Sequence, residues 1–174
     1  MKNLNGLIIR YDHDDLLILL ERFKIKNVTI INFDRHHDAD KNKSVDIGSW
    51  IYYGKLHGTI GNVIWIPPLK NFNDIIRRTI NFWRIKFIKS PVIISICYDY
   101  LIGSDVGHTT DKIKKAVAEI TKIMHFVSVS FIFCARSPQY VDLNYLEWTD
   151  NYILQHFKNT FPLSKYSQTL IPKR

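Results

Sequence analysis

The sequence predicts an α/β protein of three layers (αβα), in which helices cover both faces of a mostly parallel β-sheet. Segments typical of strands and of helices alternate along the 174 residues, as in chains built from βαβ units. The strand-like segments are apolar at successive positions rather than at alternate ones, which is typical of strands buried on both faces. The length suits one domain, because domains commonly contain about 100–200 residues.

The expected strands are short runs rich in isoleucine, valine and phenylalanine. The second strand ends abruptly in a group of acidic and imidazole side chains. The third ends at Pro67 and Pro68, whose nitrogens cannot donate to a strand ladder. These strands comprise residues 6–11, 28–33, 62–66, 91–98 and 126–134.

The expected helices follow from apolar residues that recur at helical spacing. In the clearest case, residues 110–124, the side chains of Ile113, Val117 and Ile120 fall on one face, with lysine and glutamate elsewhere. The other expected helices comprise residues 14–23, 46–56, 73–83 and 143–157.

The ends of the expected elements suggest how the chain is organised. Asp46 is the expected N-cap of the second helix, and Gly58 lies just past its end. After the last helix the chain carries no clear pattern. We therefore expect one α/β domain at residues 1–160 and a C-terminal tail at residues 161–174.

Composition limits the function classes. The net charge of +8 attracts polyanions, but the basic residues are dispersed, so an ordinary solvated surface is an equal interpretation. No apolar run approaches the about 18 residues of a membrane helix, and no signal peptide is evident, so a cytoplasmic location is expected. Cys97 and Cys134 lie in apolar runs and are expected to be buried thiols rather than a disulfide.

Aromatic side chains allow a nucleic-acid interpretation, since they could stack bases beside Arg77, Arg78 and Arg84. Most of them recur at the spacing of a protein core, however, so nucleic acid is not the expected partner. The aromatic residues concerned are Trp50, Tyr52, Tyr53, Trp65, Phe72, Phe82 and Trp83.

Polar side chains collect where the expected strands end. Because the carboxyl ends of parallel strands share one edge, segments far apart in the sequence should meet in one crevice there. These residues are Asp12 and His13, then Asp34, His36 and Asp38, then Asp99, and finally Arg136 and Ser137.

The D-x-H-x-D pattern at Asp34, His36 and Asp38 favours a metal site. In an extended loop alternate residues share a face, so two carboxylates and an imidazole would point the same way. Mixed oxygen and nitrogen ligands favour Mn²⁺, Fe²⁺ or Zn²⁺ over Ca²⁺. With His13 and Asp99 the set suits two metals that share a carboxylate. The alternative is a solvated acidic loop with ion pairs to nearby basic residues.

These motifs resemble the arginase–deacetylase (ureohydrolase-like) superfamily. The stretch RYDHDDLL resembles its N-terminal metal-histidine segment, NFDRHHD its D-x-H-x-D loop, and SICYDYL its S-x-D-x-D motif. Together with Ile47-Gly48-Ser49-Trp50 and Ala135-Arg136-Ser137-Pro138, their order is similar to a small branch that includes peptide arginases. Peptide arginases convert arginine side chains of ribosomally made peptides to ornithine.

The resemblance implies a set of metal ligands. His13, Asp34 and Asp38 would hold one Mn²⁺, while His36 and Asp99 would hold the second, with Asp34 bridging. Zn²⁺ or Fe²⁺ could replace Mn²⁺. The sequence departs from the family at Cys97, which stands where the family has a bridging aspartate. Three interpretations stay open: Cys97 binds metal, Cys97 is a bystander in a site short of one ligand, or full activity is lost.

Two further roles stay open. His57, in KLHG, resembles the histidine–glycine pair that shuttles protons in classical arginases, and His37 in the metal loop is the other candidate, with His108 a weaker third. The family's glutamate that grips the guanidinium has no counterpart near Ala135. The carboxylates that could replace it are Asp46, Glu147, Asp14 and Asp105.

The expected function is hydrolysis of a peptide's arginine side chain to ornithine and urea by a manganese-dependent, dinuclear hydrolase. The expected partner is an arginine-containing peptide with an acidic leader segment, which a basic surface would help to hold. No membrane partner is expected, and the oligomeric state stays open. The alternatives are another amidohydrolase or deacetylase of the superfamily and a non-catalytic peptide-binding protein with a decayed metal site.

Overall fold

A computed structural model of the chain describes most of the expected elements. The helix expected at 73–83 and the tail expected at 161–174 lie outside the described residues, as do Asp105 and His108. The described residues are 6–41, 44–68, 84–85, 87–88, 91–103 and 110–160.

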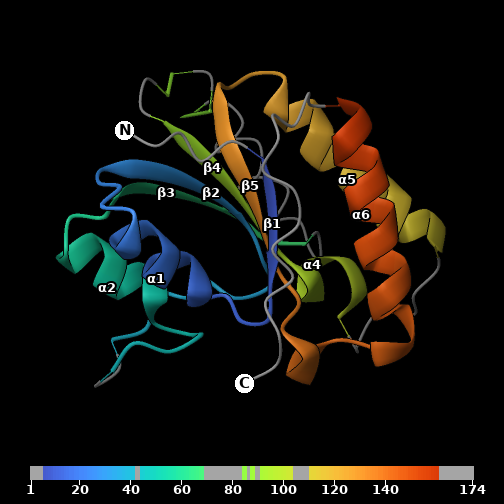
Figure 1. Ribbon diagram of the computed structural model, residues 1–174, viewed down its shortest axis with the longest axis horizontal. Helices are drawn as coiled ribbons and strands as arrows, with labels where there is room; N and C mark the ends of the chain where they lie inside the picture. Colours follow the sequence, from blue (N-terminus) through green and yellow to red (C-terminus); the bar gives the residue numbers. More distant parts are fainter. Residues whose placement is uncertain are drawn as a thin grey trace.

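The predicted α/β fold is confirmed. Five parallel strands form one sheet in the order β1-β5-β4-β2-β3, and helices cover both of its faces (Figure 1). The strands are β1 (Leu7–Arg10), β2 (Val28–Phe33), β3 (Ile60–Ile66), β4 (Val92–Cys97) and β5 (Val129–Ala135). The helices are α1 (Asp15–Arg22), α2 (Trp50–Leu56), α4 (Tyr98–Ile102), α5 (Thr110–Met124) and α6 (Leu146–Thr160), with short 3₁₀ turns at Pro138–Tyr140 and Leu143–Tyr145.

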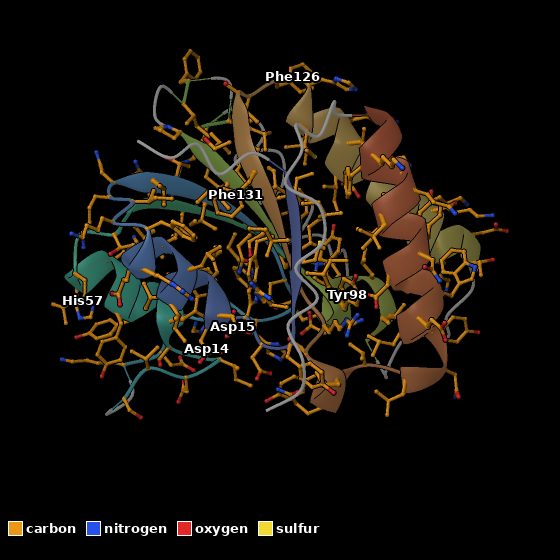
Figure 2. All side chains as sticks on the ribbon, viewed as in Figure 1. Asp14, Asp15, His57, Tyr98, Phe126 and Phe131 are labelled. Carbon is orange, nitrogen blue, oxygen red and sulfur yellow. The ribbon has the colours of Figure 1, made fainter. Side chains whose placement is uncertain are left out.

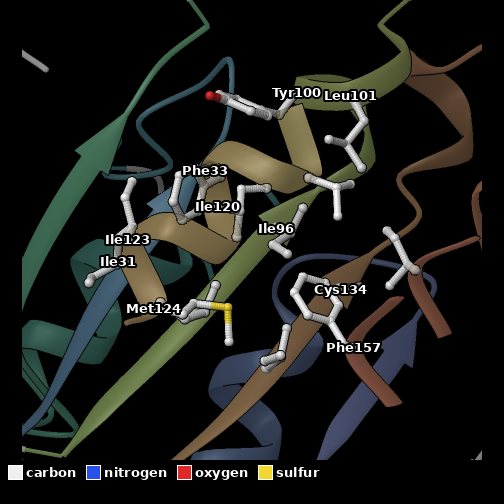
Figure 3. Close-up of a cluster of buried hydrophobic side chains, with 14 of the residues drawn as sticks. Ile31, Phe33, Ile96, Tyr100, Leu101, Ile120, Ile123, Met124, Cys134 and Phe157 are labelled. Atoms are coloured by element: carbon white, nitrogen blue, oxygen red, sulfur yellow. The ribbon is translucent and has the colours of Figure 1, made fainter. Parts of the chain in front are cut away.

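Two hydrophobic cores lie on opposite faces of the sheet. The first packs α4, α5 and α6 against the strands, and Figure 3 shows Phe33, Ile120 and Phe157 within it. The second packs α1 and α2 against the other face through Leu16, Trp50 and their neighbours. Every residue of β2 and β4 is buried, which explains their unbroken apolar sequences. Among the described helices, none combines the length and apolar character needed to cross a membrane.

The sequence-based ends of several elements were wrong, and two of these differences lie near the polar cluster. The strand expected to run through Tyr98 ends at Cys97, where a short helix begins, so Asp99 lies in the first turn of α4. Asp46 is not the N-cap of α2: that helix begins later, with Ser49 as its N-cap, because Asp46 closes a preceding turn by accepting a hydrogen bond from the Gly48 nitrogen.

Strand order creates a crevice between β2 and β4. From β2 the chain passes through α2 to β3 at one edge, whereas after β4 it passes through helices on the other face to β5. The connection that follows β2 and the one that follows β4 therefore lead toward opposite edges of the sheet. In parallel sheets, ligands bind between two neighbouring strands whose connections separate in this way. Phe33 pairs with Ile96, so Asp34, just past the end of β2, follows the sheet beside Cys97, the last residue of β4.

Candidate metal centre

Three segments bring the predicted ligands together at the carboxyl ends of the strands. His13 lies in the turn between β1 and α1, Asp34 follows β2, and Asp99 follows β4. With Asp38 and Cys97 they line a cavity of about 330 Å³. The convergence predicted from the sequence is therefore present in the structure, although the metal-binding role itself stays a prediction.

A first group of ligand atoms surrounds the imidazole of His13. Its Nδ1 lies 2.8 Å from an oxygen of Asp34 and 3.0 Å from an oxygen of Asp38. Cys97 contributes a sulfur, which lies with the ligand atoms of His13 and Asp34 within 4.8 Å of one another. All four of these side chains are buried.

A second group shares Asp34 with the first. The Nδ1 of His36 lies 2.9 Å from an oxygen of Asp99 and 3.7 Å from the other oxygen of Asp34. The ligand atoms of Asp34, His36 and Asp99 also lie within 4.8 Å of one another. Asp34 and Asp99 are buried, whereas His36 is 57% exposed, so this group faces the opening of the cavity.

The buried polar atoms of this cluster fit metal ions. Among the described residues, Nδ1 of His13, Oδ2 of Asp34 and the carboxylate oxygens of Asp99 are buried, and the short contacts of these atoms are ion-pair distances to other members of the cluster. Such atoms are costly to bury unless something compensates them. Ligands about 2.1 Å from one cation, at right angles, lie about 3 Å apart, which matches the observed separations. The residues present therefore fit a shared pair of divalent cations.

The loop reaches this arrangement in a way that the sequence did not suggest. We expected an extended D-x-H-x-D segment with all three side chains on one face. Instead the chain bends at Arg35 and His36, and Asp38 has a φ of 52°, in the left-handed region that aspartate tolerates better than most residues. Asp38 therefore turns toward His13, while His36 turns toward Asp99.

Two buried side chains orient the first group. Ser95 Oγ lies 2.6 Å from Nε2 of His13, which leaves Nδ1 as the ligand atom. Trp50 donates from Nε1 to an oxygen of Asp38 at 2.7 Å, and its ring lies 4.9 Å from that of His13. Such neighbours fix the direction of a ligand and tune its basicity. Sequence reasoning did not assign these roles, although both residues lie in the quoted motifs.

Replacing Trp50 by phenylalanine is expected to weaken metal binding at the first group about 10- to 100-fold, because Asp38 loses its donor. Equilibrium dialysis with Mn²⁺ measures the change. Trp148→Phe is the matched control, since Trp148 lies on α6 and stacks on Tyr152, away from the cavity. Equal affinities in wild type and Trp50→Phe would contradict the orienting role.

Charge coupling within the cluster shifts its pKa values. Burial alone would lower the pKa of His13, but the carboxylates of Asp34 and Asp38 outweigh burial and hold it well above 6.5. Hydrogen bonds to Asp34 and Asp99 raise the pKa of His36 to about 10. Burial and the charge of Asp34 raise the pKa of Asp38 to about 6. Burial would raise the pKa of Asp34, but the two imidazoles hold it below its usual value.

The two candidate proton shuttles lie in different places. His37 lines the cavity, with its Nε2 3.5 Å from the exposed carboxylate of Asp40. His57 is the C-cap of α2 and lies just before β3 begins, so it is at the edge of the sheet where the strands start (Figure 2). Its Nδ1 lies 2.7 Å from a carboxylate oxygen of Glu21. The structure therefore does not bring His57 to the crevice, because the carboxyl ends of the strands lie at the opposite edge.

The carboxylates suggested for the guanidinium do not line the cavity in the described structure. Asp46 closes the turn before α2, Glu147 is exposed in the first turn of α6, and Asp14 lies at the start of α1. Asp40, which sequence reasoning did not single out for this role, does line the cavity and is 62% exposed. It continues the alternation of Asp34, His36 and Asp38, a signal that could have identified it.

The fold and the cluster together define a parallel α/β protein with a carboxylate–histidine cluster that could hold metal ions at its switch point. The sequence matches no family model and no curated protein. The structure is similar to a hypothetical agmatinase from Burkholderia thailandensis (TM-score 0.65, 17% identity, 90% of this chain and 58% of that one). It is also similar to formimidoylglutamase from Bacillus subtilis, with a TM-score of 0.63 and 19% identity over 93% of this chain and 62% of that one. A third similar structure is arginase from Medicago truncatula, with a TM-score of 0.52 and 14% identity over 82% of this chain and 54% of that one.

These neighbours are ureohydrolases, and the chain has their fold. The fold expected from the motif resemblance is thereby confirmed. The chain spans only 54–62% of the length of these three proteins, and identities are below 20%. The likeness therefore establishes the shared architecture, and substrate and reaction are matters for proposal.

Proposed function

We propose that this chain is a dinuclear metal hydrolase that cleaves the guanidinium group of an arginine side chain in a peptide, giving ornithine and urea. The observation that carries the proposal is the pair of ligand groups sharing Asp34 at the switch point of a ureohydrolase-like sheet. His13, Asp34 and Asp38 would hold one cation, and His36 and Asp99 the other. Two bound divalent cations supply a water of lowered pKa and Lewis-acid activation of the C–N bond.

The residues around the cluster have the chemistry to support this reaction. Burial of Asp34 and Asp99 keeps their charges in a setting of low dielectric, where they interact strongly with cations. His37 lies at the opening of the cavity, where an imidazole can hand a proton to the departing amine. The ring of Trp65 lies edge-on to that of His37, with centroids 6.1 Å apart, which restricts its position.

An open cavity rim supports a peptide substrate. His36, His37 and Asp40 are each more than half exposed, and Tyr140 beside them is 44% exposed. A side chain carried on a peptide can therefore enter while its backbone stays outside. The net charge of +8 would help to hold an acidic leader segment.

Asp40 is the carboxylate best placed to contact the guanidinium of the substrate. Asp40→Asn is expected to raise KM for an arginyl peptide about tenfold with a smaller effect on kcat, because the contact is present before and during the reaction. Asp46→Asn, the residue suggested by the sequence, tests the alternative in the same assay. A larger KM effect for Asp46→Asn would assign the contact to Asp46.

The reaction is tested with purified protein loaded with Mn²⁺ and an arginine-containing peptide. The expected products are urea and a peptide lighter by CN₂H₂, which mass spectrometry places on one arginine. Free arginine and agmatine, run in parallel, show whether the peptide context is needed. If none of these substrates releases urea from metal-loaded protein, the proposal is wrong.

Metal stoichiometry separates the proposal from its rivals. A zinc amidohydrolase or deacetylase is the second candidate, because Cys97 contributes a ligand type that zinc accepts readily. Such an enzyme would bind one Zn²⁺ and release acetate from an acetylated peptide. A peptide-binding protein with a decayed site would bind peptide without turnover.

Metal binding is expected to tighten as pH rises from about 6.5 to 8.5, because neutral imidazoles are the ligands. In the metal-free chain the pKa of His36 is raised to about 10 and that of His13 is also raised, so binding must displace both protons. Each displaced proton makes the affinity rise about tenfold per pH unit. Calorimetry in buffers of different ionisation enthalpy counts the protons, and an affinity independent of pH would contradict this linkage.

A further inference from the structure

The two ligand groups differ in chemistry because of Cys97. The group of Asp34, His36 and Asp99 offers oxygen and nitrogen, whereas the group of His13, Asp34 and Cys97 adds a sulfur. Cys97 is the last residue of β4 and the N-cap of α4, so backbone on both sides holds its position. Its side chain is 3% exposed and lines the cavity.

The ligand types gathered around Cys97 point to a cation beside the sulfur. Nδ1 of His13 and Oδ2 of Asp34 are buried and lie 2.8 Å apart, and His13, Asp34 and Cys97 offer ligand atoms within 4.8 Å of one another. The sulfur makes a long contact, 3.3 Å, with Oγ of Ser137, which a metal–sulfur bond could replace. A cation here would be held by a nitrogen, an oxygen and a sulfur at once.

We propose that Cys97 binds metal as a thiolate, which gives the two metal positions different preferences. The position of His13, Asp34 and Cys97 takes a softer cation such as Zn²⁺, Fe²⁺ or Co²⁺, while that of His36 and Asp99 takes Mn²⁺. The S–H proton passes to solvent as the sulfur–metal bond forms. This inference rests on the metal centre of the proposed function, but it does not depend on the substrate.

Cobalt tests the ligand directly, because a thiolate bound to Co²⁺ gives a charge-transfer absorption in the near ultraviolet. Metal-free protein titrated with Co²⁺ is expected to develop this band with the first equivalent. Cys97→Ser should lose the band and bind Zn²⁺ at least about tenfold more weakly. Cys134→Ala is the matched control: Cys134 is equally buried but packs in the core with Phe157, so its loss should leave the band intact.

Competition tests the difference between the positions. Protein offered one equivalent of Zn²⁺ and a large excess of Mn²⁺ is expected to hold one of each, measured by mass spectrometry of the metals, because a given site binds Zn²⁺ more tightly than Mn²⁺ at equal concentration. Cys97→Asp, which restores the aspartate of the family pattern, should retain less Zn²⁺ against the same excess of Mn²⁺. Circular dichroism of each metal-free variant checks that it is folded.

The outcomes separate this inference from the proposed function. Two bound Co²⁺ ions without the charge-transfer band would overturn the role of Cys97 and leave the dinuclear centre standing. Retention of the band in Cys97→Ser would overturn it as well. No binding of any divalent cation would overturn both.

Discussion

Asp34→Asn is expected to abolish binding of both metal ions and to lower urea release at least about a thousandfold. Asp34 is the one residue shared by the two ligand groups, with one oxygen facing His13 at 2.8 Å and the other on the side of His36. The amide has nearly the same shape, but it carries no charge and can place N–H donors where a cation would lie. The loss should therefore affect both positions together.

The metal content of Asp34→Asn is measured after equilibration with Mn²⁺ and dialysis, beside urea release from the same samples. Asp111→Asn is the matched control, because Asp111 is 79% exposed in the first turn of α5, outside the two ligand groups. If Asp34→Asn kept two ions per chain, Asp34 would not be the shared ligand. If it lost the ions but kept full urea release, the reaction would not depend on this centre.

Asp150→Ala is expected to lower the free energy of unfolding by about 3 kcal/mol. Asp150 on α6 accepts hydrogen bonds from Nε and Nη2 of Arg136 after β5, and from the hydroxyl of Tyr98 at 2.7 Å. Tyr98 is fully buried beneath α6, and its position is visible in Figure 2. Removing the carboxylate leaves the largely buried guanidinium of Arg136 and the hydroxyl of Tyr98 without their shared acceptor. Leaving buried donors without an acceptor lowers the free energy of unfolding.

Urea denaturation of the metal-free protein measures this loss. Asp111→Ala, which removes an exposed carboxylate 3.9 Å from Lys114, should change stability by about 0.5 kcal/mol or less. A double-mutant cycle with Tyr98→Phe isolates the coupling between the hydroxyl and the carboxylate. A loss below about 1 kcal/mol for Asp150→Ala would show that the pair contributes little.

This network also assigns Arg136 a structural position. The Ala135-Arg136-Ser137-Pro138 stretch was grouped with the site because it follows a strand at the carboxyl edge. In the structure, Arg136 turns to α6, while Ser137 stays in the cavity wall with a left-handed φ of 42° and accepts from Cys97. Of these two neighbouring residues, Arg136 therefore helps to hold α6 in place, whereas Ser137 forms part of the cavity wall.

The sequence by itself determined the type and order of the described strands and of α1, α2, α5 and α6, but not the short helix α4, and it indicated the sheet edge at which the candidate site lies. Local patterns suffice for this, because burial and backbone preference act residue by residue: β2 and α5 have the ends that their apolar spacing predicted. The polar residues after β1, β2 and β4 were identifiable as a cluster, because parallel strands end on the same side.

Only the tertiary structure decided which residues meet. Strand order placed β2 beside β4, and this adjacency brings Asp34, Asp99 and Cys97 together. The same order leaves His57 at the far edge, although its local sequence resembles a catalytic motif. The sequence also did not determine the directions of the side chains in the loops. The left-handed conformation of Asp38 and the hydrogen bond that Asp38 accepts from Trp50 depend on packing between separate segments. Pairwise contacts of this kind depend on long-range packing, which no single stretch of sequence specifies.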